Sequence, residues 1–195
     1  MITFMASLHH VEELRITLET CYRALKPGGC IWAWEYIGPN YFDYPPEHTA
    51  LARHLFHGID PRLRKSWEPH LRFPTVEEVT ANDPTESAHS AEILDALKHV
   101  FPAVDVTPLY GSFAFIMFWG LNHDAIYELP EGEELVRAIL MIDELMIDAG
   151  KIPPYFANIV ARKPTRRQQA ASRLGVNPYG GGYRLAHAVR KRLGM

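Results

Sequence analysis

The sequence has few cysteines and no long apolar run, and both absences exclude classes of protein. Its 195 residues contain two cysteines, Cys21 and Cys30, which match neither a disulfide framework nor a zinc-binding spacing. The longest apolar segment, Phe113 to Trp119, is far shorter than the roughly 20 residues that a membrane-spanning helix needs. The apolar start at Met1 lacks the basic region of a signal peptide. We therefore expect a cytoplasmic protein without membrane association.

Glycine-rich loops are absent after every segment that has the pattern of a strand. The glycine cluster Gly180 to Gly182 lies instead in a basic C-terminal stretch, where it is typical of a flexible linker. A glycine-rich turn after a strand is what lets the backbone approach a nucleotide closely. The sequence therefore contains no complete nucleotide-binding fingerprint.

Acidic residues are missing from the end of the chain. Residues 162–195 contain nine Lys or Arg and no Asp or Glu, so the total net charge of −3 leaves −12 for residues 1–161. We divide the chain into a body, 1–163, and a basic, partly flexible tail, 164–195. The tail could attract nucleic acid or anionic lipid, or dock on the acidic body. Because it lacks the aromatic interleaving of a single-strand platform, nucleic acid is not an expected partner.

The apolar pattern at the start of the body predicts a strand, a helix and a second strand. Ile2 to Ala6 has the pattern of a short buried strand, and apolar residues then recur at helical spacing from Val11 to Leu25. Pro27-Gly28-Gly29 ends that helix, and the almost continuously apolar segment Cys30 to Ile37 predicts a strand buried on both faces. A right-handed βαβ unit follows, so the expected fold class is α/β.

The rest of the body contains an insertion and further elements of the same fold class. Residues 38–74 are rich in Pro, aromatic residues and His, which indicates an insertion or lid with a short helix at Glu47 to His57. Thr75-Val76-Glu77-Glu78 matches a capping box. The pattern also predicts helices over Ser90 to Phe101 and Glu133 to Ala149, and strands over Val104 to Leu109 and Phe156 to Ala161.

Several motifs follow one another in a fixed order. They are Ser7-Leu8-His9-His10, Arg23-Ala24-Leu25-Lys26-Pro27-Gly28-Gly29, Trp34-Glu35-Tyr36-Ile37-Gly38-Pro39, Asp83-Pro84-Thr85-Glu86-Ser87 and the segment Phe156 to Pro164. Over about residues 2–164, the chain resembles the C-terminal portion of a class I S-adenosylmethionine-dependent methyltransferase of the small-molecule, type 11-like branch. The glycine-rich motif of that family lies before this portion.

The resemblance implies a fold, a cofactor and an activity. The fold would be a partial Rossmann-like methyltransferase sheet, the fourth to seventh strands of the order 3-2-1-4-5-7-6, with helices on both faces. S-adenosyl-L-methionine would be the cofactor, and the methyl group would go to a small-molecule acceptor, with oxygen as the expected atom. A missing N-terminal half of roughly 80–100 residues, or a homo-oligomer, would complete the cofactor site.

Two readings of this chain remain open. In one, it takes part in methyl transfer once that site is complete and is inactive as a truncated chain. In the other, it is a non-catalytic interaction module, or a fragment of a pseudo-enzyme, that pairs with another polypeptide through its exposed sheet edge.

The resemblance also assigns residues to the cofactor and the acceptor. Ser7, Leu8 and His9 would lie near the methionine end of the cofactor, and Glu35 and Tyr36 would face the acceptor. Ligands of such sheets bind beyond the carboxyl ends of the strands, where these residues are expected to converge.

The candidate catalytic residues are His9, His10 and Glu35. An imidazole titrates near neutral pH, so either histidine could take a proton from an acceptor hydroxyl, although both could instead serve packing and helix initiation. A carboxylate in an apolar strand is costly to bury without partners, which places Glu35 in a site or at the exposed end of its strand.

Metal binding is not predicted. His54 and His57 are three residues apart in an expected helix, but no cysteine or carboxylate-rich spacing accompanies them. We therefore expect no metal among the ligands of this protein.

Overall fold

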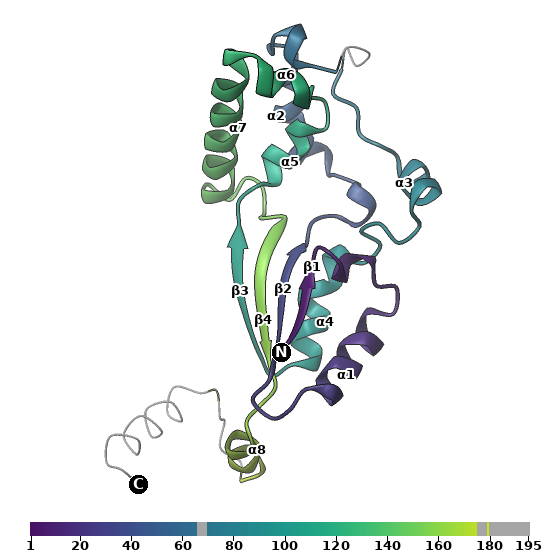
Figure 1. The fold of residues 1–195 in the computed structure, drawn as a ribbon, viewed down its shortest axis with the longest axis vertical. Helices are drawn as coiled ribbons and strands as arrows, with labels where there is room; N and C mark the ends of the chain where they lie inside the picture. The colour runs from purple at the N-terminus through teal and green to yellow at the C-terminus, as the bar shows by residue number, and fades with distance from the viewer. Residues whose placement is uncertain (66–69, 175–178, 180–195) are drawn as a thin grey trace, which may run out of the picture.

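A four-stranded mixed sheet forms the centre of the computed structural model, which describes residues 1–65, 70–174 and 179 (Figure 1). Its strands are β1 (Ile2–Met5), β2 (Cys30–Tyr36), β3 (Ala103–Leu109) and β4 (Phe156–Arg162). Their spatial order is β1-β2-β4-β3. β1 and β2 are parallel, whereas β4 runs antiparallel to both of its neighbours. The fold class is α/β, as the sequence predicts.

One face of the sheet is covered by α1 (Leu14–Ala24) and α4 (Ile93–Val100) (Figure 1). Alternate residues of β2 and β4 point at these helices and are fully buried, in keeping with the two-residue period of strands. The shared core contains Leu14, Leu18, Ile31, Ala33, Ile93, Leu97, Phe101, Ala157, Ile159 and Ala161. Gly28, with a φ of 83°, turns the chain between α1 and β2, which explains why glycine follows the proline there.

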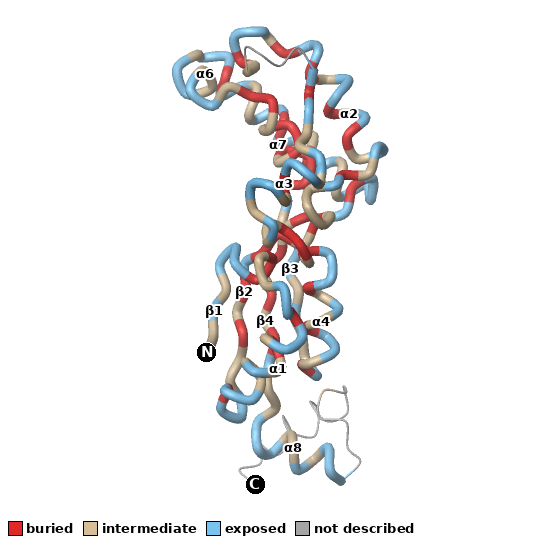
Figure 2. Tube along the Cα trace, turned by 90° about the vertical axis from the view of Figure 1, so that its right-hand side faces the viewer, coloured by how far each residue is buried: buried red, intermediate tan, exposed pale blue. Residues whose placement is uncertain are grey.

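β1 lies at the edge of the sheet, and the prediction that it is buried was wrong. Its residues alternate between intermediate and exposed (Figure 2). Among the described residues, β1 pairs with β2 and with no second strand, so its outer side has no partner that could bury it. Apolar content alone predicts a strand here, but it does not predict how many neighbours the strand has.

The face opposite α1 and α4 carries large apolar side chains that stay accessible. Trp34 is 36% exposed and Met5 is 69% exposed. Trp34 stacks on Phe156, but neither Trp34 nor Met5 belongs to a buried cluster of the described residues. The sequence predicts helices on both faces of the sheet. Among the described residues, α1 and α4 cover one face of this part of the sheet, and the face with Trp34 and Met5 stays accessible.

A helical cap lies beyond the carboxyl ends of β1 and β2 (Figure 1). It consists of α2 (Pro46–Phe56), α5 (Ser112–Phe118), α6 (His123–Glu128) and α7 (Pro130–Asp148). These helices share a second hydrophobic core with Tyr36 and Tyr155 at the strand ends. Part of the expected insertion, 38–74, therefore packs together with helices from much later in the chain.

Short elements complete the described chain. α3 (Val76–Asn82) begins at the capping box that the sequence predicts, with Thr75 and Glu78 bonded to each other's amides. The others are the 3-10 helices η1 (Leu8–His10), η2 (Asn40–Phe42), η3 (Pro61–Leu63) and η4 (Ser90–Glu92), and α8 (Arg166–Arg173). The predicted linker Gly180 to Gly182 lies outside the described residues. No helix within the described ranges combines the length and the apolar character needed to cross a membrane.

A buried carboxylate fixes the start of α5 in the cap. Asp143 of α7 has no exposed surface and accepts hydrogen bonds from the amides of Gly111, Phe113 and Ala114, with N–O distances of 2.5, 2.6 and 3.1 Å. The first amides of a helix have no partner within the helix, and its N-terminus favours negative charge. Asp143 thus holds α5 against α7 from a neighbouring helix.

Candidate functional site

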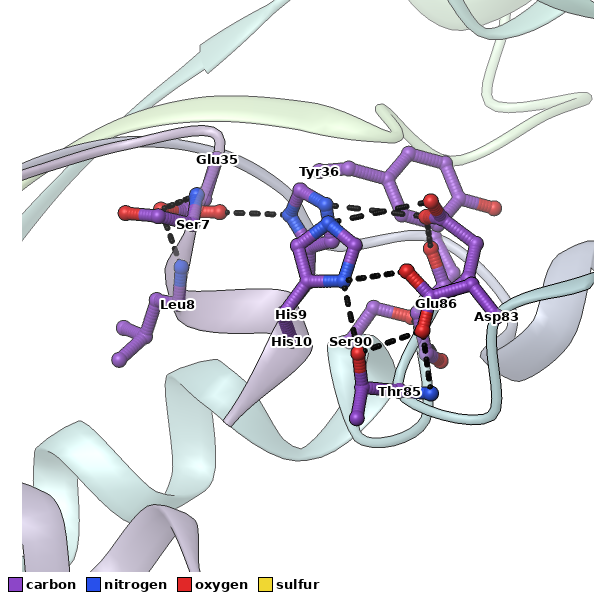
Figure 3. Close-up of polar contacts among 12 residues, drawn as sticks. Ser7, Leu8, His9, His10, Glu35, Tyr36, Asp83, Thr85, Glu86 and Ser90 are labelled. Atoms are coloured by element: carbon purple, nitrogen blue, oxygen red, sulfur yellow. Dashed lines mark hydrogen bonds and ion pairs between the residues drawn. The ribbon is translucent and has the colours of Figure 1, made fainter. Parts of the chain in front are cut away.

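Three of the predicted motifs meet at the carboxyl ends of β1 and β2. The motif Ser7 to His10 follows β1, Glu35 and Tyr36 end β2, and Asp83 to Ser87 precedes η4 (Figure 3). Because β1 and β2 are parallel neighbours, their carboxyl ends lie at the same edge of the sheet. The convergence expected for Ser7, Leu8, His9, His10, Glu35 and Tyr36 is present.

Glu35 is the buried centre of this site. Its carboxylate has no exposed surface, and Oε1 accepts hydrogen bonds from the amides of Ser7 at 3.0 Å and Leu8 at 2.8 Å. Its Oε2 lies 2.8 Å from Nδ1 of His9. Three donors therefore satisfy the carboxylate, which offsets the cost of burying it. Glu35 acts on its surroundings through the first turn after β1 and through His9, and it has no direct access to solvent.

The bond to Glu35 fixes which nitrogen of His9 is free. An ionised carboxylate only accepts hydrogen bonds, so Nδ1 of His9 carries the proton and donates it. In the neutral imidazole, Nε2 then has a free lone pair. This nitrogen points toward Glu86, whose Oε1 is 3.7 Å away (Figure 3).

His10 is oriented in the same way by the loop from Asp83 to Ser87. Its Nδ1 lies 3.2 Å from Oγ1 of Thr85, and that hydroxyl donates to Oδ1 of Asp83 at 2.7 Å. Hydrogen bonds from the Thr85 hydroxyl and amide lower the pKa of Asp83, so Asp83 is the ionised acceptor. The hydroxyl hydrogen of Thr85 is therefore donated to Asp83, and Oγ1 of Thr85 accepts a hydrogen bond from Nδ1 of His10. Nε2 of His10 has the free lone pair and lies 3.8 Å from Oε2 of Glu86.

Two non-glycine residues with left-handed backbone flank the site. Ala6 has a φ of 45° and precedes Ser7, and Ser87 has a φ of 52° and follows Glu86. Each such residue costs on the order of 1 kcal/mol and persists where surrounding contacts hold it. At Ala6 the turn directs the next two amides at Glu35, and at Ser87 the hydroxyl donates to Oε1 of Glu86.

The side chains of Leu8 and Tyr36 are committed to packing. Leu8 is fully buried in the core beneath the sheet, so a ligand could reach only its backbone. Tyr36 is also buried, its ring lies edge-on to His9, and its hydroxyl donates to the carbonyl of Pro39. Burial raises the pKa of Tyr36 far above its usual range, so the phenol stays protonated. The roles predicted for these residues near cofactor and acceptor remain predictions.

Comparisons with known proteins assign no family to this site. No family model and no curated protein matches this chain. Its chemistry is therefore inferred from its own residues.

The sequence did not single out Asp83, Thr85 and Glu86 as site residues. They face His9 and His10 across the site although they follow them by more than 70 positions. The local pattern is the hydroxyl of Thr85 between the carboxylates of Asp83 and Glu86, shortly before an expected helix. The same pattern is typical of turns and helix caps, so it does not by itself indicate a site. Only the packing of η4 and α4 beside the sheet brings this loop to the histidines.

Proposed function

We propose that this chain forms the acceptor side of a class I S-adenosylmethionine-dependent methyltransferase, acting on a hydroxyl oxygen of a small molecule. The order β1-β2-β4-β3 with β4 antiparallel carries the proposal. If β1 to β4 are the fourth to seventh strands, the family order 4-5-7-6 requires this arrangement. The polar cluster at the carboxyl ends of β1 and β2 lies where ligands of such sheets bind.

The described residues fit only part of the cofactor. Ser7 is exposed beside His9 at the end of β1, where the methionine end of S-adenosylmethionine would lie. No strand of the described chain ends in a glycine-rich turn that could take the nucleotide. In this proposal the nucleotide-binding part would lie beside the free edge of β1.

His9 and Glu35 would activate the acceptor. The cofactor supplies a methyl group on a sulfonium that is already a good leaving group, so placement of the acceptor is the main task of the protein. When bound, the cofactor would give its methyl group to the acceptor oxygen and leave as the neutral thioether, and Nε2 of His9 would accept the proton of the acceptor hydroxyl. Glu35 keeps the proton of the other ring nitrogen in place and stabilises the imidazolium that forms. Glu35 is thus a positioning residue.

Cofactor binding tests the proposed function. S-adenosylmethionine and S-adenosylhomocysteine would be titrated calorimetrically into the 195-residue chain and into a longer chain that includes any coding sequence before Met1. We expect binding in the micromolar range by the longer chain and none by the 195-residue chain, because the latter lacks the nucleotide-binding loop. Binding by the 195-residue chain would keep the methyltransferase proposal but contradict the need for a second segment. Binding by neither chain would contradict the proposal.

The free edge of β1 favours a second function, a non-catalytic module that pairs with a second copy of the chain. Ala6 N donates to the carbonyl of Trp34 at 2.8 Å. By the two-residue alternation of strands, the amides of Thr3 and Met5 point away from β2. Two such edges related by a two-fold axis could pair with each other and cover Met5.

A proline at position 3 tests edge pairing. Thr3→Pro removes an outward amide and should weaken self-association at least about tenfold, with a change in unfolding free energy below about 1 kcal/mol, because edge strands tolerate proline on their free side. Light scattering after size exclusion measures the first quantity and urea unfolding the second. Phe4→Pro is the matched control: it removes an inward amide and should destabilise the sheet itself. A wild-type chain that is monomeric at every concentration would contradict this module.

A further inference from the structure

Two ring nitrogens and one carboxylate of the site face one small region, and Oε1 of that carboxylate also accepts from the hydroxyl of Ser87. One ligand atom from each of His9, His10 and Glu86 lies within 4.8 Å of those of the other two. The carboxylate of Glu86 is 3.7 Å from Nε2 of His9 and 3.8 Å from Nε2 of His10. These distances are too long for hydrogen bonds. These distances, and the 4.8 Å within which the three ligand atoms lie, exceed the roughly 3.4 Å between ligand atoms that tetrahedral zinc with bonds of about 2.0–2.1 Å requires, so the side chains would have to move closer around an ion.

The hydrogen bonds around the histidines leave no ring N–H directed at the carboxylate of Glu86. Nδ1 of His9 donates to Glu35, and Nδ1 of His10 donates to Thr85. With both rings neutral, two nitrogen lone pairs and a carboxylate face one another. Such an arrangement repels itself unless a proton or a cation lies between the three groups.

The outer hydrogen bonds are those that metal-binding histidines use. A ligating histidine usually donates its second ring nitrogen to a carboxylate, a carbonyl or a water, which fixes the ring and increases its basicity. Here Glu35, buried and satisfied by two amides, performs this role for His9. Thr85, fixed by Asp83, performs it for His10. Both supports are in place in the described structure.

We propose that His9, His10 and Glu86 bind one divalent transition-metal ion, with zinc as the ion that best suits two imidazoles and a carboxylate. Zinc sites with three protein ligands keep an open position, whereas structural sites are closed by four. His10 and Glu86 are partly exposed, with side-chain exposures of 35% and 28%, so the fourth position faces solvent. It would hold a water or a hydroxyl, whose pKa the ion lowers.

The metal site goes beyond the proposed function and does not depend on it. A proton and a metal ion compete for the same lone pair on Nε2 of His9. A metal-bound form would therefore activate a hydroxyl by coordination, and a metal-free form by proton transfer. Metal binding can be measured on the 195-residue chain without any cofactor.

Titration with Zn²⁺ and Co²⁺ tests the site. We expect one equivalent to bind, and Co²⁺ to give the visible absorption of a four-coordinate ion. His10→Ala and Glu86→Gln each remove a ligand and should weaken binding more than about 100-fold, since loss of a supporting hydrogen bond alone costs about 10–100-fold. Thr85→Val removes the hydroxyl that joins His10 to Asp83 but leaves all three ligands in place, and it should weaken binding about tenfold.

A second pair of histidines provides the control. The rings of His57 and His70 lie 5.2 Å apart, and neither residue is among the candidate ligands His9, His10 and Glu86. His57→Ala should leave the affinity for Zn²⁺ unchanged, and far-ultraviolet circular dichroism should show that every variant is folded. Unchanged Zn²⁺ affinity in folded His10→Ala and Glu86→Gln would overturn the proposal, as would loss of binding in His57→Ala alone.

Discussion

Replacing Glu35 with alanine is expected to lower the free energy of unfolding by about 3–5 kcal/mol. The substitution leaves the amide of Leu8 and Nδ1 of His9 buried without their acceptor, and it removes the partner of the Ser7 amide. An unsatisfied buried donor costs about 1–3 kcal/mol, and the vacated space adds a packing loss. Urea unfolding monitored by circular dichroism measures the effect, and a loss below 1 kcal/mol would contradict the central role of Glu35.

Glu35→Gln separates the effect of Glu35 on stability from its effect on the tautomer of His9. In Glu35→Gln the amide oxygen can still accept from Ser7 and Leu8, so the loss of stability should be smaller than for alanine. Its NH₂ group would face Nδ1 of His9, which must then become the acceptor, so the proton of the ring moves to Nε2. Nitrogen-15 chemical shifts of the His9 ring report this tautomer directly. Glu12→Gln, at an exposed position before α1, is the matched control and should change neither quantity.

Replacing Asp143 with alanine should cost about 3–4 kcal/mol, the second large loss of stability in this fold. Its carboxylate accepts hydrogen bonds from three amides at the start of α5, and those of Phe113 and Ala114 gain no water when it is removed, because these two residues are buried. Thermal and urea unfolding would measure the loss.

The neighbouring residue on α7 is the control for Asp143. Glu144 is exposed, so Glu144→Ala should stay within about 0.5 kcal/mol of the wild type. Asp143→Asn keeps one acceptor oxygen but loses the charge that favours a helix N-terminus, so an intermediate loss is expected. Equal stability of Asp143→Ala and Glu144→Ala would show that the α5 amides find other partners.

Part of this fold follows from local patterns in the sequence. The apolar periods predict β2, β3, β4, α1 and α7 close to their observed bounds, and the capping box at Thr75 predicts the start of α3. Glu35 was recognisable as a site residue because a carboxylate in an apolar strand needs partners. These predictions succeed because each depends on residues close together in the chain.

The remaining features depend on contacts between distant segments. Apolar content did not indicate that β1 lacks an outer neighbour, since an edge strand and a central strand can have similar composition. The importance of Asp143 depends on α5 beginning beside α7, and that of Glu86 on a loop meeting the end of β1. An acidic residue on a helix or in a loop is most often solvated, so nothing local in the sequence distinguishes Asp143 or Glu86 from an exposed carboxylate.

The distances along the chain within the site determine the order in which it can form during folding. Glu35 and His9 are separated by 26 residues, whereas Thr85 and His10 are separated by 75. Closing the shorter loop costs less chain entropy, so the pair formed by Glu35 and His9 can assemble with the βαβ unit. His10 and the loop with Glu86 become fixed only when η4 and α4 dock. The connectivity therefore favours orienting His9 at a lower cost in chain entropy than placing His10 against Thr85.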